Sequence, residues 1–304
     1  MRIRLLMSLL AVSILLSGAL WLRNTSAATG LQAYVEGRTL CGVVDSVRAV
    51  KLSTDQRRRA WQLKLETSRG PSDGEVTLFR TPEGDWWAPS TNKTGLQFGI
   101  AEHAREPYGL PAKGQIVLDA GANVGLFTRA ALDAGAKLVV AIEPVPANVE
   151  ALKRNFSAEI AEGRVVVYPK GVWNAEDTLE MYLYSESQLD SFTMTSRPES
   201  VSAPKRVALP LTTIDALVRE LNLPRVDFIK MDIEGAEKQA LEGGAETLRR
   251  YRPRLAVATE NLLNDAVAIP QSVFALVPEY EEQRGECVQL ENGIIAPEVT
   301  FFAT

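Results

Sequence analysis

From Gly114 onward, short apolar runs alternate with segments whose apolar residues recur at helical spacing. The apolar runs lie at residues 116–118, 138–142, 165–167, 226–233 and 255–258. Apolar strands separated by amphipathic helices are typical of a parallel sheet that is covered on both faces. The sequence therefore predicts a doubly wound α/β domain over residues 114–304. Thr212 and Asp215 form a capping-box pattern that predicts one of its helices, over residues 214–221.

Composition limits the classes of protein to which the chain can belong. It has 304 residues, of which 46% are hydrophobic, and a net charge of −5, so we expect a globular protein. The acidic balance argues against a nucleic-acid partner, which normally requires a basic surface. One histidine, His103, and two cysteines, Cys41 and Cys287, are too few for a disulfide framework or a zinc site. We expect both cysteines to be inert.

The N-terminus carries an uncharged apolar segment at residues 5–22, between Arg4 and Arg23. A membrane-spanning helix needs about 20 apolar residues, whereas the apolar part of a signal peptide has about 7–15. Small residues near Ala27 fit a cleavage site. Residues 1–28 are therefore predicted to be a retained apolar helix that anchors the chain in a membrane, or a signal peptide. The flanking charges favour a cytoplasmic N-terminus only slightly, so the side of the membrane stays open.

Residues 29–113 are predicted to be a β-rich accessory region that contributes to substrate binding. Trp61, Leu63 and Leu65 alternate with polar residues, which is the pattern of a half-buried strand. A second strand is predicted at residues 75–80, followed by a turn at 82–85 and by the pair Trp86-Trp87. This order predicts a hairpin.

The first strand of the α/β domain leads into Asp119, Gly121 and Gly125. Ligands of doubly wound sheets bind at the carboxyl ends of the strands, where the strand order reverses. Gly121 permits a tight turn and Gly125 permits close packing at the start of the next helix. The spacing differs from the G-x-G-x-x-G fingerprint of dinucleotide-binding proteins. Asp119 would repel a pyrophosphate, but it suits an ammonium group.

The second strand ends in Glu143-Pro144. An acid at this position can accept hydrogen bonds from both hydroxyls of a ribose. A glycine loop with an acid beside it, followed by a ribose-binding acid, fits a nucleoside with a cationic amino-acid tail, which is S-adenosylmethionine. Two alternatives stay open: an NAD-dependent oxidoreductase on the same architecture, and a catalytically silent nucleoside-binding scaffold at a membrane.

Lys230, Asp232 and Glu234 alternate at the end of the fourth strand, and Glu237 follows in the first turn of a helix. If the methyl group is transferred to a hydroxyl, that hydroxyl is a poor nucleophile until its proton is removed or polarised. We expect Asp232 to act as the base, with Lys230 and Glu237 setting its orientation. His103 is the second candidate, because histidine titrates near neutral pH. Asp232 has no acidic neighbour, so no metal site is predicted.

Several motifs taken together carry a family resemblance. They are Val117-Leu118-Asp119-Ala120-Gly121-Ala122-Asn123-Val124-Gly125, Ile142-Glu143-Pro144, Gly171-Val172, Leu211-Thr212-Thr213-Ile214-Asp215 and Phe228-Ile229-Lys230-Met231-Asp232-Ile233-Glu234-Gly235-Ala236-Glu237. With this ordered set, which lies within about residues 85–258, the chain resembles FkbM-like S-adenosylmethionine-dependent methyltransferases.

The resemblance implies a seven-stranded, Rossmann-like methyltransferase sheet whose last strand is antiparallel. It also implies O-methylation of a hydroxyl on a sugar, glycan or polyketide-like metabolite. The cofactor-binding residues expected on this basis are Asp119, Gly121, Asn123, Gly125, Glu143, Pro144, Gly171 and Asp232. The acceptor stays open, because the segments that often select it lie outside the resemblance.

Overall fold

The computed structural model describes residues 25–304 apart from 184–204, 263 and 291. The apolar segment at residues 5–22 therefore lies outside the described residues. Within the described part of the chain, no helix is long and apolar enough to cross a membrane. The chain divides into two compact units. We call Met1–Gln56 with Glu286–Glu298 the N-terminal unit, and Arg57–Gly285 with Val299–Thr304 the sheet unit.

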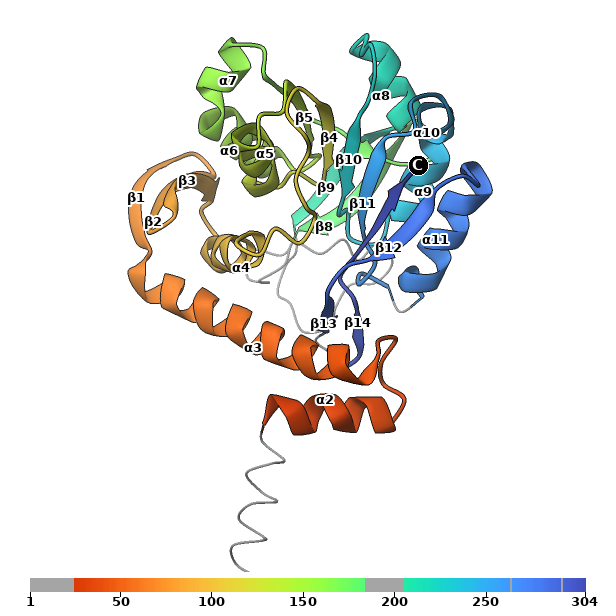
Figure 1. Ribbon diagram of the computed structural model, residues 1–304. Coiled ribbons are helices and arrows are strands. Elements are labelled where there is room, and N and C mark those ends of the chain that lie inside the picture. Colours follow the sequence, from red (N-terminus) through yellow and green to blue (C-terminus); the bar gives the residue numbers. More distant parts are fainter. Residues whose placement is uncertain (1–24, 184–204, 263, 291) are drawn as a thin grey trace, which may run out of the picture. The chain divides into compact units, whose positions relative to one another are not determined.

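The sheet unit is built on a seven-stranded mixed sheet with the strand order β12-β15-β11-β10-β4-β5-β6 (Figure 1). Its strands are β4 (Ile116–Ala120), β5 (Leu138–Ile142), β6 (Val165–Tyr168), β10 (Phe228–Met231), β11 (Arg254–Ala258), β12 (Glu281–Arg284) and β15 (Val299–Ala303). Strands β4, β5, β6, β10 and β11 run parallel, and β15 is antiparallel to both of its neighbours. The predicted parallel sheet with an antiparallel last strand is confirmed.

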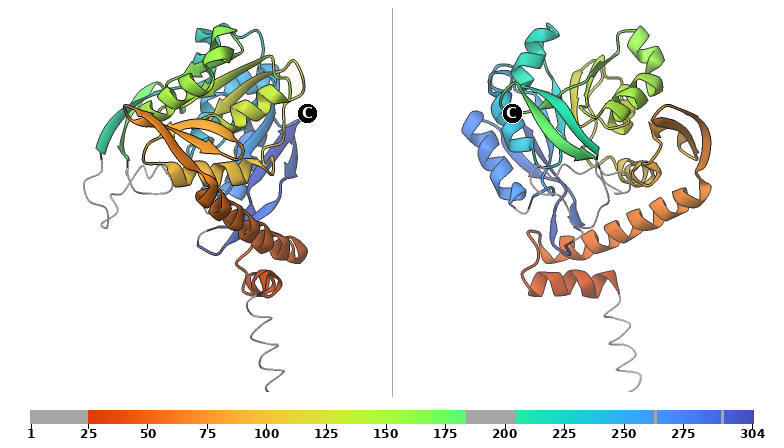
Figure 2. Two further views of the ribbon diagram at one scale, coloured as in Figure 1. Left: turned by 90° about the vertical axis from the view of Figure 1, so that its left-hand side faces the viewer. Right: turned by 180° about the vertical axis from the view of Figure 1, so that it is seen from behind.

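Helices cover both faces of this sheet (Figures 1 and 2). One face carries α5 (Leu126–Asp133), α6 (Pro146–Asn155) and α7 (Ser157–Ala161), and the other carries α8 (Ile214–Glu220), α9 (Glu237–Gly243), α10 (Ala245–Tyr251) and α11 (Asp265–Leu276). Each face has its own apolar cluster, one with Phe127, Leu152 and Phe156, the other with Ile214, Leu241 and Ile269. Every residue of β4 and β10 is buried, as a central strand with two covered faces requires.

The strand order reverses between β4 and β10. The chain passes outward from β4 through β5 to β6, and after further elements it returns on the other side of β4 as β10. Ala120 at the end of β4 pairs with Met231 at the end of β10. The loops after these two strands therefore leave the sheet side by side, and a gap between diverging loops is where such sheets bind ligands. A separate three-stranded sheet lies between β6 and α8 in the sequence: β7 (Gly171–Val172), β8 (Asp177–Leu183) and β9 (Lys205–Thr212).

The region predicted to be β-rich is mainly helical, so that prediction is wrong. It holds α2 (Ser26–Val35), α3 (Val43–Glu66) and α4 (Lys93–His103), with one three-stranded sheet of β1 (Ser68–Asp73), β2 (Val76–Thr81) and β3 (Gly84–Pro89). The predicted hairpin is confirmed as β2–β3. The predicted strand at residues 61–65 lies instead inside α3, where Leu63 is buried and Trp61 and Leu65 are exposed. A five-residue alternation is too short to distinguish the period of a strand from the period of a helix.

Helix α8 begins at Ile214 as predicted, but its N-cap lies one residue after Thr212, the position that the capping-box pattern predicts. Its N-cap is Thr213, whose hydroxyl accepts a hydrogen bond from the Ala216 amide at 3.0 Å. Asp215 does not close the box. Its carboxylate accepts from the amides of Glu246 and Thr247 at the start of α10 instead, and so joins the two helices.

The N-terminal unit contains a disulfide between Cys41 and Cys287, so the expectation that both cysteines are inert is wrong. Cys287 opens a hairpin of β13 (Cys287–Gln289) and β14 (Ile295–Pro297), in which Ile295 forms a parallel bridge with Thr39. The sulfurs join segments 246 residues apart in the sequence. The small core beside them consists of Ala33, Ala49, Val50 and Ile295. A core of this size gains much from a covalent link.

Candidate functional site

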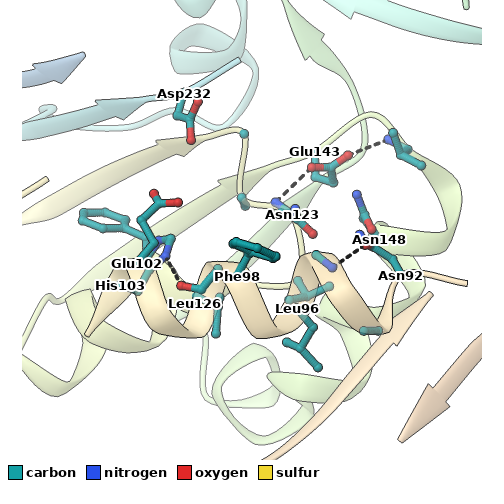
Figure 3. Close-up of a pocket in the computed structure, with 18 of the residues that line it drawn as sticks. Asn92, Leu96, Phe98, Glu102, His103, Asn123, Leu126, Glu143, Asn148 and Asp232 are labelled. Atoms are coloured by element: carbon teal, nitrogen blue, oxygen red, sulfur yellow. Dashed lines mark hydrogen bonds between the residues drawn. The ribbon is translucent and has the colours of Figure 1, made fainter. Parts of the chain in front are cut away.

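A cavity opens where β4 and β10 end (Figure 3). The loop after β4 contributes its backbone from Gly121 to Val124, and the loop after β10 contributes Asp232 and Glu234. Helix α4 forms the opposite wall with Phe98, Glu102 and His103 among others. We call this space the main cavity. It lies at the predicted ligand edge of the sheet.

Two glycines allow the loop after β4 to adopt its path. Gly121 has φ +78°, and a Cβ built on it would lie 1.8 Å from the carbonyl oxygen of Asp232. Gly125 has φ +99° at the N-cap of α5, and its Cβ would lie 2.1 Å from the Phe156 ring. Neither position has room for a side chain. Both glycines are needed for the fold of the site, whatever it binds.

Glu143 follows β5 and is buried. One oxygen of its carboxylate accepts a hydrogen bond from the Asn123 amide at 2.9 Å, and the other accepts from the Val145 amide at 2.8 Å (Figure 3). Each carboxylate oxygen can accept a further bond. The two amides therefore fix the orientation of Glu143 and leave it able to accept hydrogen bonds from a ligand.

Glu143 also lies at the border of a second, smaller cavity. Gly121 and Glu143 line both spaces, and the smaller cavity continues past Pro144, Val172 and Trp173 to Ile233. Gly171, another predicted site residue, lies in its wall. Apart from Glu143, these side chains are apolar or aromatic, so the smaller cavity suits a flat apolar group.

Lys230 lies in β10 with its ammonium group buried under the main cavity. Its Nζ donates to the carbonyl oxygens of Gly121 at 2.8 Å and Ala120 at 3.3 Å, and lies 3.4 Å from Oδ1 of Asp119. Asp119 is fully buried in β4, and its other oxygen, Oδ2, accepts a hydrogen bond from the Thr128 hydroxyl at 2.6 Å. Burial alone would lower the pKa of Lys230, but the charges of Asp119 and Asp232 outweigh it and raise that pKa. Lys230 therefore stays charged.

Asp232 is the first residue after β10, and its side chain lies in the wall of the main cavity (Figure 3). Its Oδ2 accepts a hydrogen bond from the hydroxyl of Tyr108 at 2.8 Å. Tyr108 comes from the loop between α4 and β4 and was not predicted from the sequence. It follows no periodic pattern there, and only the folded chain brings it next to Asp232.

His103 ends α4 and faces the same cavity as Asp232 (Figure 3). Its Nδ1 lies 3.0 Å from the carbonyl oxygen of Gly99. A carbonyl oxygen only accepts hydrogen bonds, so Nδ1 carries the proton. Burial, and next the charge of Lys230, lower the pKa of His103 to about 4. The imidazole is therefore neutral at pH 7 and a weak base.

Glu237 lies behind the loop that follows β10 and is buried. Its Oε1 accepts from the Ile233 amide at 2.9 Å and from the side chain of Asn261 at 2.8 Å. Burial is the main cause that raises the pKa of Glu237 to about 7, and repulsion from Asp232 adds to it. Through its hydrogen bonds with Ile233 and Asn261, Glu237 links the loops after β10 and β11.

Two non-glycine residues of the cavity wall have left-handed backbones, Asn123 with φ 50° and Glu234 with φ 58°. Such strain often accumulates at functional sites. A third wall residue, Asn148 on α6, is buried, and its side-chain oxygen has no hydrogen-bond partner among the described atoms. A buried amide oxygen without a partner is a place where a ligand can donate a hydrogen bond.

The predicted site residues fall into two groups. Gly121, Asn123, Glu143, Asp232, His103 and Lys230 line the main cavity, and Pro144 and Gly171 line the smaller one. Asp119, Gly125 and Glu237 instead hold the loops from behind. Asp119 stabilises the charge of Lys230 and does not line either cavity. Across the described chain, no three histidine, cysteine or acidic residues are grouped so as to hold a metal ion.

The raised pKa of Glu237 makes a testable prediction about stability. Its folded pKa, about 7, lies above its ordinary value of 4.5, so the folded state holds the proton more tightly. Its contribution to stability is therefore complete below pH 4.5 and is lost as the pH rises to about 7. Glu237→Gln imitates the protonated acid. When the pH rises from 4.5 to 8, the free energy of unfolding of this variant should fall by about 1–3 kcal/mol less than that of the wild-type protein.

Chemical denaturation at both pH values measures this difference. Glu242→Gln, at an exposed position of the same helix, is the matched control and should follow the wild-type protein. Parallel loss of stability in all three proteins would contradict the prediction.

Solved structures resemble this chain at low sequence identity. The methyltransferase FkbM from Methylobacillus flagellatus KT is 17% identical with a TM-score of 0.46, and the match covers 86% of this chain and 60% of that one. An rRNA methylase from Streptococcus thermophilus is 13% identical with a TM-score of 0.41, covering 67% and 95% of the two chains. M. jannaschii TYW2 in complex with AdoMet is 13% identical with a TM-score of 0.40, and the match covers 77% of this chain and 87% of that one. The chain thus spans about three fifths of the first structure.

A comparison with curated protein sequences finds no significant match. The model of the methyltransferase FkbM domain, however, matches residues 119–284. This stretch includes the loops after β4, β5 and β10 that form both cavities. It makes up more than half of the 304 residues, and the chain therefore belongs to the FkbM methyltransferase family.

Proposed function

We propose that this protein is an S-adenosylmethionine-dependent O-methyltransferase that acts on a hydroxyl of a sugar, glycan or polyketide-like metabolite. The observation that carries the proposal is the position of Glu143 between two cavities, at the carboxyl ends of the strands next to the switch point of the sheet. A nucleoside with an amino-acid tail has the same three parts in the same order: a flat base, a ribose and a charged chain.

The residues present fit this cofactor. The smaller cavity, with Pro144, Val172 and Ile233, suits the adenine. Glu143 is oriented by two amides and can accept from the ribose hydroxyls. The methionine part would then extend past Gly121 into the main cavity, toward Asp232. When bound, the cofactor supplies a methyl group on a positively charged sulfur.

The task of the protein is to align the acceptor oxygen and to accept or polarise its proton. Asp232 suits this role because it reaches the main cavity and accepts a bond from Tyr108 through only one of its oxygens. His103 is the weaker candidate base, since its pKa is about 4. Lys230 holds the carbonyls of the loop after β4, and Glu237 holds the loop after β10.

The charge of the main cavity supports a neutral acceptor. The acids in its described wall are Glu102, Glu143, Asp232 and Glu234, whereas Lys230 is the one permanent cation there. His103 is neutral at pH 7, since its pKa is about 4. An acceptor with phosphate groups would be repelled, so nucleic acid is not proposed as a substrate although some structural neighbours are RNA methylases.

The first test concerns the cofactor. Glu143→Gln removes the charge that accepts from the ribose and should weaken S-adenosylhomocysteine binding by about 1.5–3 kcal/mol, or roughly 10- to 100-fold. Isothermal titration calorimetry with S-adenosylhomocysteine and with NAD measures this and also separates the alternatives. Glu150→Gln on the exposed side of α6 is the matched control and should bind as tightly as the wild-type protein.

Each alternative has its own result in this titration. Binding of NAD alone would favour an oxidoreductase, and binding of neither ligand would favour a silent scaffold. Equal affinity of Glu143→Gln and the wild-type protein would remove Glu143 from the site.

The second test concerns the base. Asp232→Asn should lower turnover by about 10²- to 10⁴-fold, the usual contribution of a general base. Formation of S-adenosylhomocysteine is followed with a panel of neutral sugars and hydroxylated metabolites as acceptors. His103→Gln is compared in parallel and should keep most of the activity. If His103→Gln abolishes turnover while Asp232→Asn retains it, the base is His103.

We further propose that the chain is attached to a membrane through residues 5–22. The N-terminal unit supports this, because large apolar side chains are exposed on it soon after that segment: Leu31, Tyr34, Val35, Leu40, Val43 and Val44. Helix α2 itself has no charged residue. The Cys41–Cys287 disulfide favours an oxidising compartment for this unit, since cytosolic thiols are normally kept reduced.

Cell fractionation tests this location. The full chain should sediment with membranes and resist extraction by high salt, which releases proteins held only by surface charge. In cells treated with an alkylating reagent before lysis, Cys41 and Cys287 should react only after reduction. An uncleaved chain found entirely in the soluble fraction would refute attachment, and thiols that react without reduction would refute the oxidising compartment.

A further inference from the structure

Tyr108 has an unusually complete set of contacts for a residue in a loop. Its side chain is buried, and its hydroxyl donates to Oδ2 of Asp232 at 2.8 Å. Its ring packs edge-on against Phe127, with 6.1 Å between the ring centroids. The ammonium group of Lys230 lies 5.2 Å from the centroid of the same ring. The ring is therefore fixed from two sides, and the hydroxyl has one defined direction.

The direction of the hydroxyl decides how Asp232 is held. A carboxylate that accepts a hydrogen bond from a fixed donor loses most of its freedom to rotate. Tyr108 binds Oδ2, and the Asp232 side chain lies in the wall of the main cavity, so Oδ1 is the oxygen that we expect to meet a ligand there. Among the described residues, Lys230, His103 and Glu237 each interact electrostatically with Asp232.

The surroundings of Asp232 contain more negative than positive charge. The positive charge of Lys230 interacts with the negative charges of both Asp119 and Asp232. Glu102 also attracts Lys230 electrostatically. His103 supplies no charge at neutral pH, because its pKa is about 4. A cation that enters the cavity would therefore be stabilised more than a neutral molecule of the same shape.

We propose, on the basis of the function proposed above, that Tyr108 is a positioning residue that holds the Asp232 carboxylate toward the sulfonium of the methyl donor. The donor is then bound more tightly than the product, S-adenosylhomocysteine, which has the same shape but lacks the positive charge on sulfur. Methyl transfer would break the bond between sulfur and the methyl carbon, form the bond to the acceptor oxygen and pass the hydroxyl proton to Asp232. Neither the sulfur nor the carboxylate would then be charged, so the product would lose this attraction.

The test compares the affinities of the two ligands and needs no acceptor. Calorimetric titrations at low salt give Kd for S-adenosylmethionine and for S-adenosylhomocysteine with each variant. The wild-type protein should favour the methyl donor. Asp232→Asn should reduce this preference about tenfold, and Tyr108→Phe about threefold or more, because each loses part of a charge-assisted interaction. Tyr108→Phe keeps the ring and its contact with Lys230.

Tyr280→Phe is the matched control. Tyr280 is also buried, and its hydroxyl donates to the Pro253 carbonyl at 2.6 Å, outside both cavities. Removal of the Tyr280 hydroxyl should lower the melting temperature, as Tyr108→Phe does, but should not change the ratio of the two Kd values. In the Asp232→Asn background, Tyr108→Phe should have no further effect on the ratio, because the two residues act as one unit.

Each other outcome has a definite meaning. An unchanged ratio in Tyr108→Phe, or an equal fall in Tyr280→Phe, would overturn the role of Tyr108. Equal affinities of the wild-type protein for both ligands would overturn the discrimination by charge. If the wild-type protein binds neither ligand, the proposed function itself fails, and this inference fails with it.

Discussion

The buried ammonium group of Lys230 is the interaction on which the site depends. An unpaired charge inside a protein costs several kcal/mol, so a buried lysine needs partners of defined geometry. Here those partners are Asp119 in the neighbouring strand, the carbonyl of Ala120 at the end of that strand and the carbonyl of Gly121 at the start of the loop that forms the cavity wall. The charge therefore fixes the path of the loop after β4. Because Gly121 also passes against the backbone of Asp232, the positions of both loops are coupled.

The sequence predicts those parts of the molecule whose signal is local. The strands at 138–142 and 255–258 are apolar runs of strand length, and both lie in the sheet as expected. Glu143 follows such a run and Asp232 lies near the end of the predicted strand at 226–233, so both are predicted at the edge where parallel strands end together. The resemblance to FkbM-like methyltransferases supplied the antiparallel last strand, which composition alone does not reveal.

Features that depend on distant contacts carry no such signal. Tyr108 lies in a loop 124 residues before Asp232 and meets it only in the folded chain. Cys41 and Cys287 are 246 residues apart, so their pairing cannot be inferred from spacing. The error at Trp61 has another cause: five alternating residues fit a strand, yet neighbouring residues favour a helix that buries Ala60 and Leu63 together. The local signal was present there but ambiguous.

Two of the perturbed acid–base groups of the site, His103 and Glu237, respond to pH in opposite directions. The folded pKa of His103, about 4, lies below its ordinary value of 6.5, so its contribution to stability is present above pH 6.5 and is lost as the pH falls toward 4. Glu237, with a folded pKa of about 7, loses its contribution as the pH rises from 4.5. Near neutral pH the site therefore lacks the positive charge of His103, while Glu237 is partly ionised near Asp232. A bound cation would reduce that repulsion, so the same charges that destabilise the free site would favour a positively charged ligand such as the proposed methyl donor.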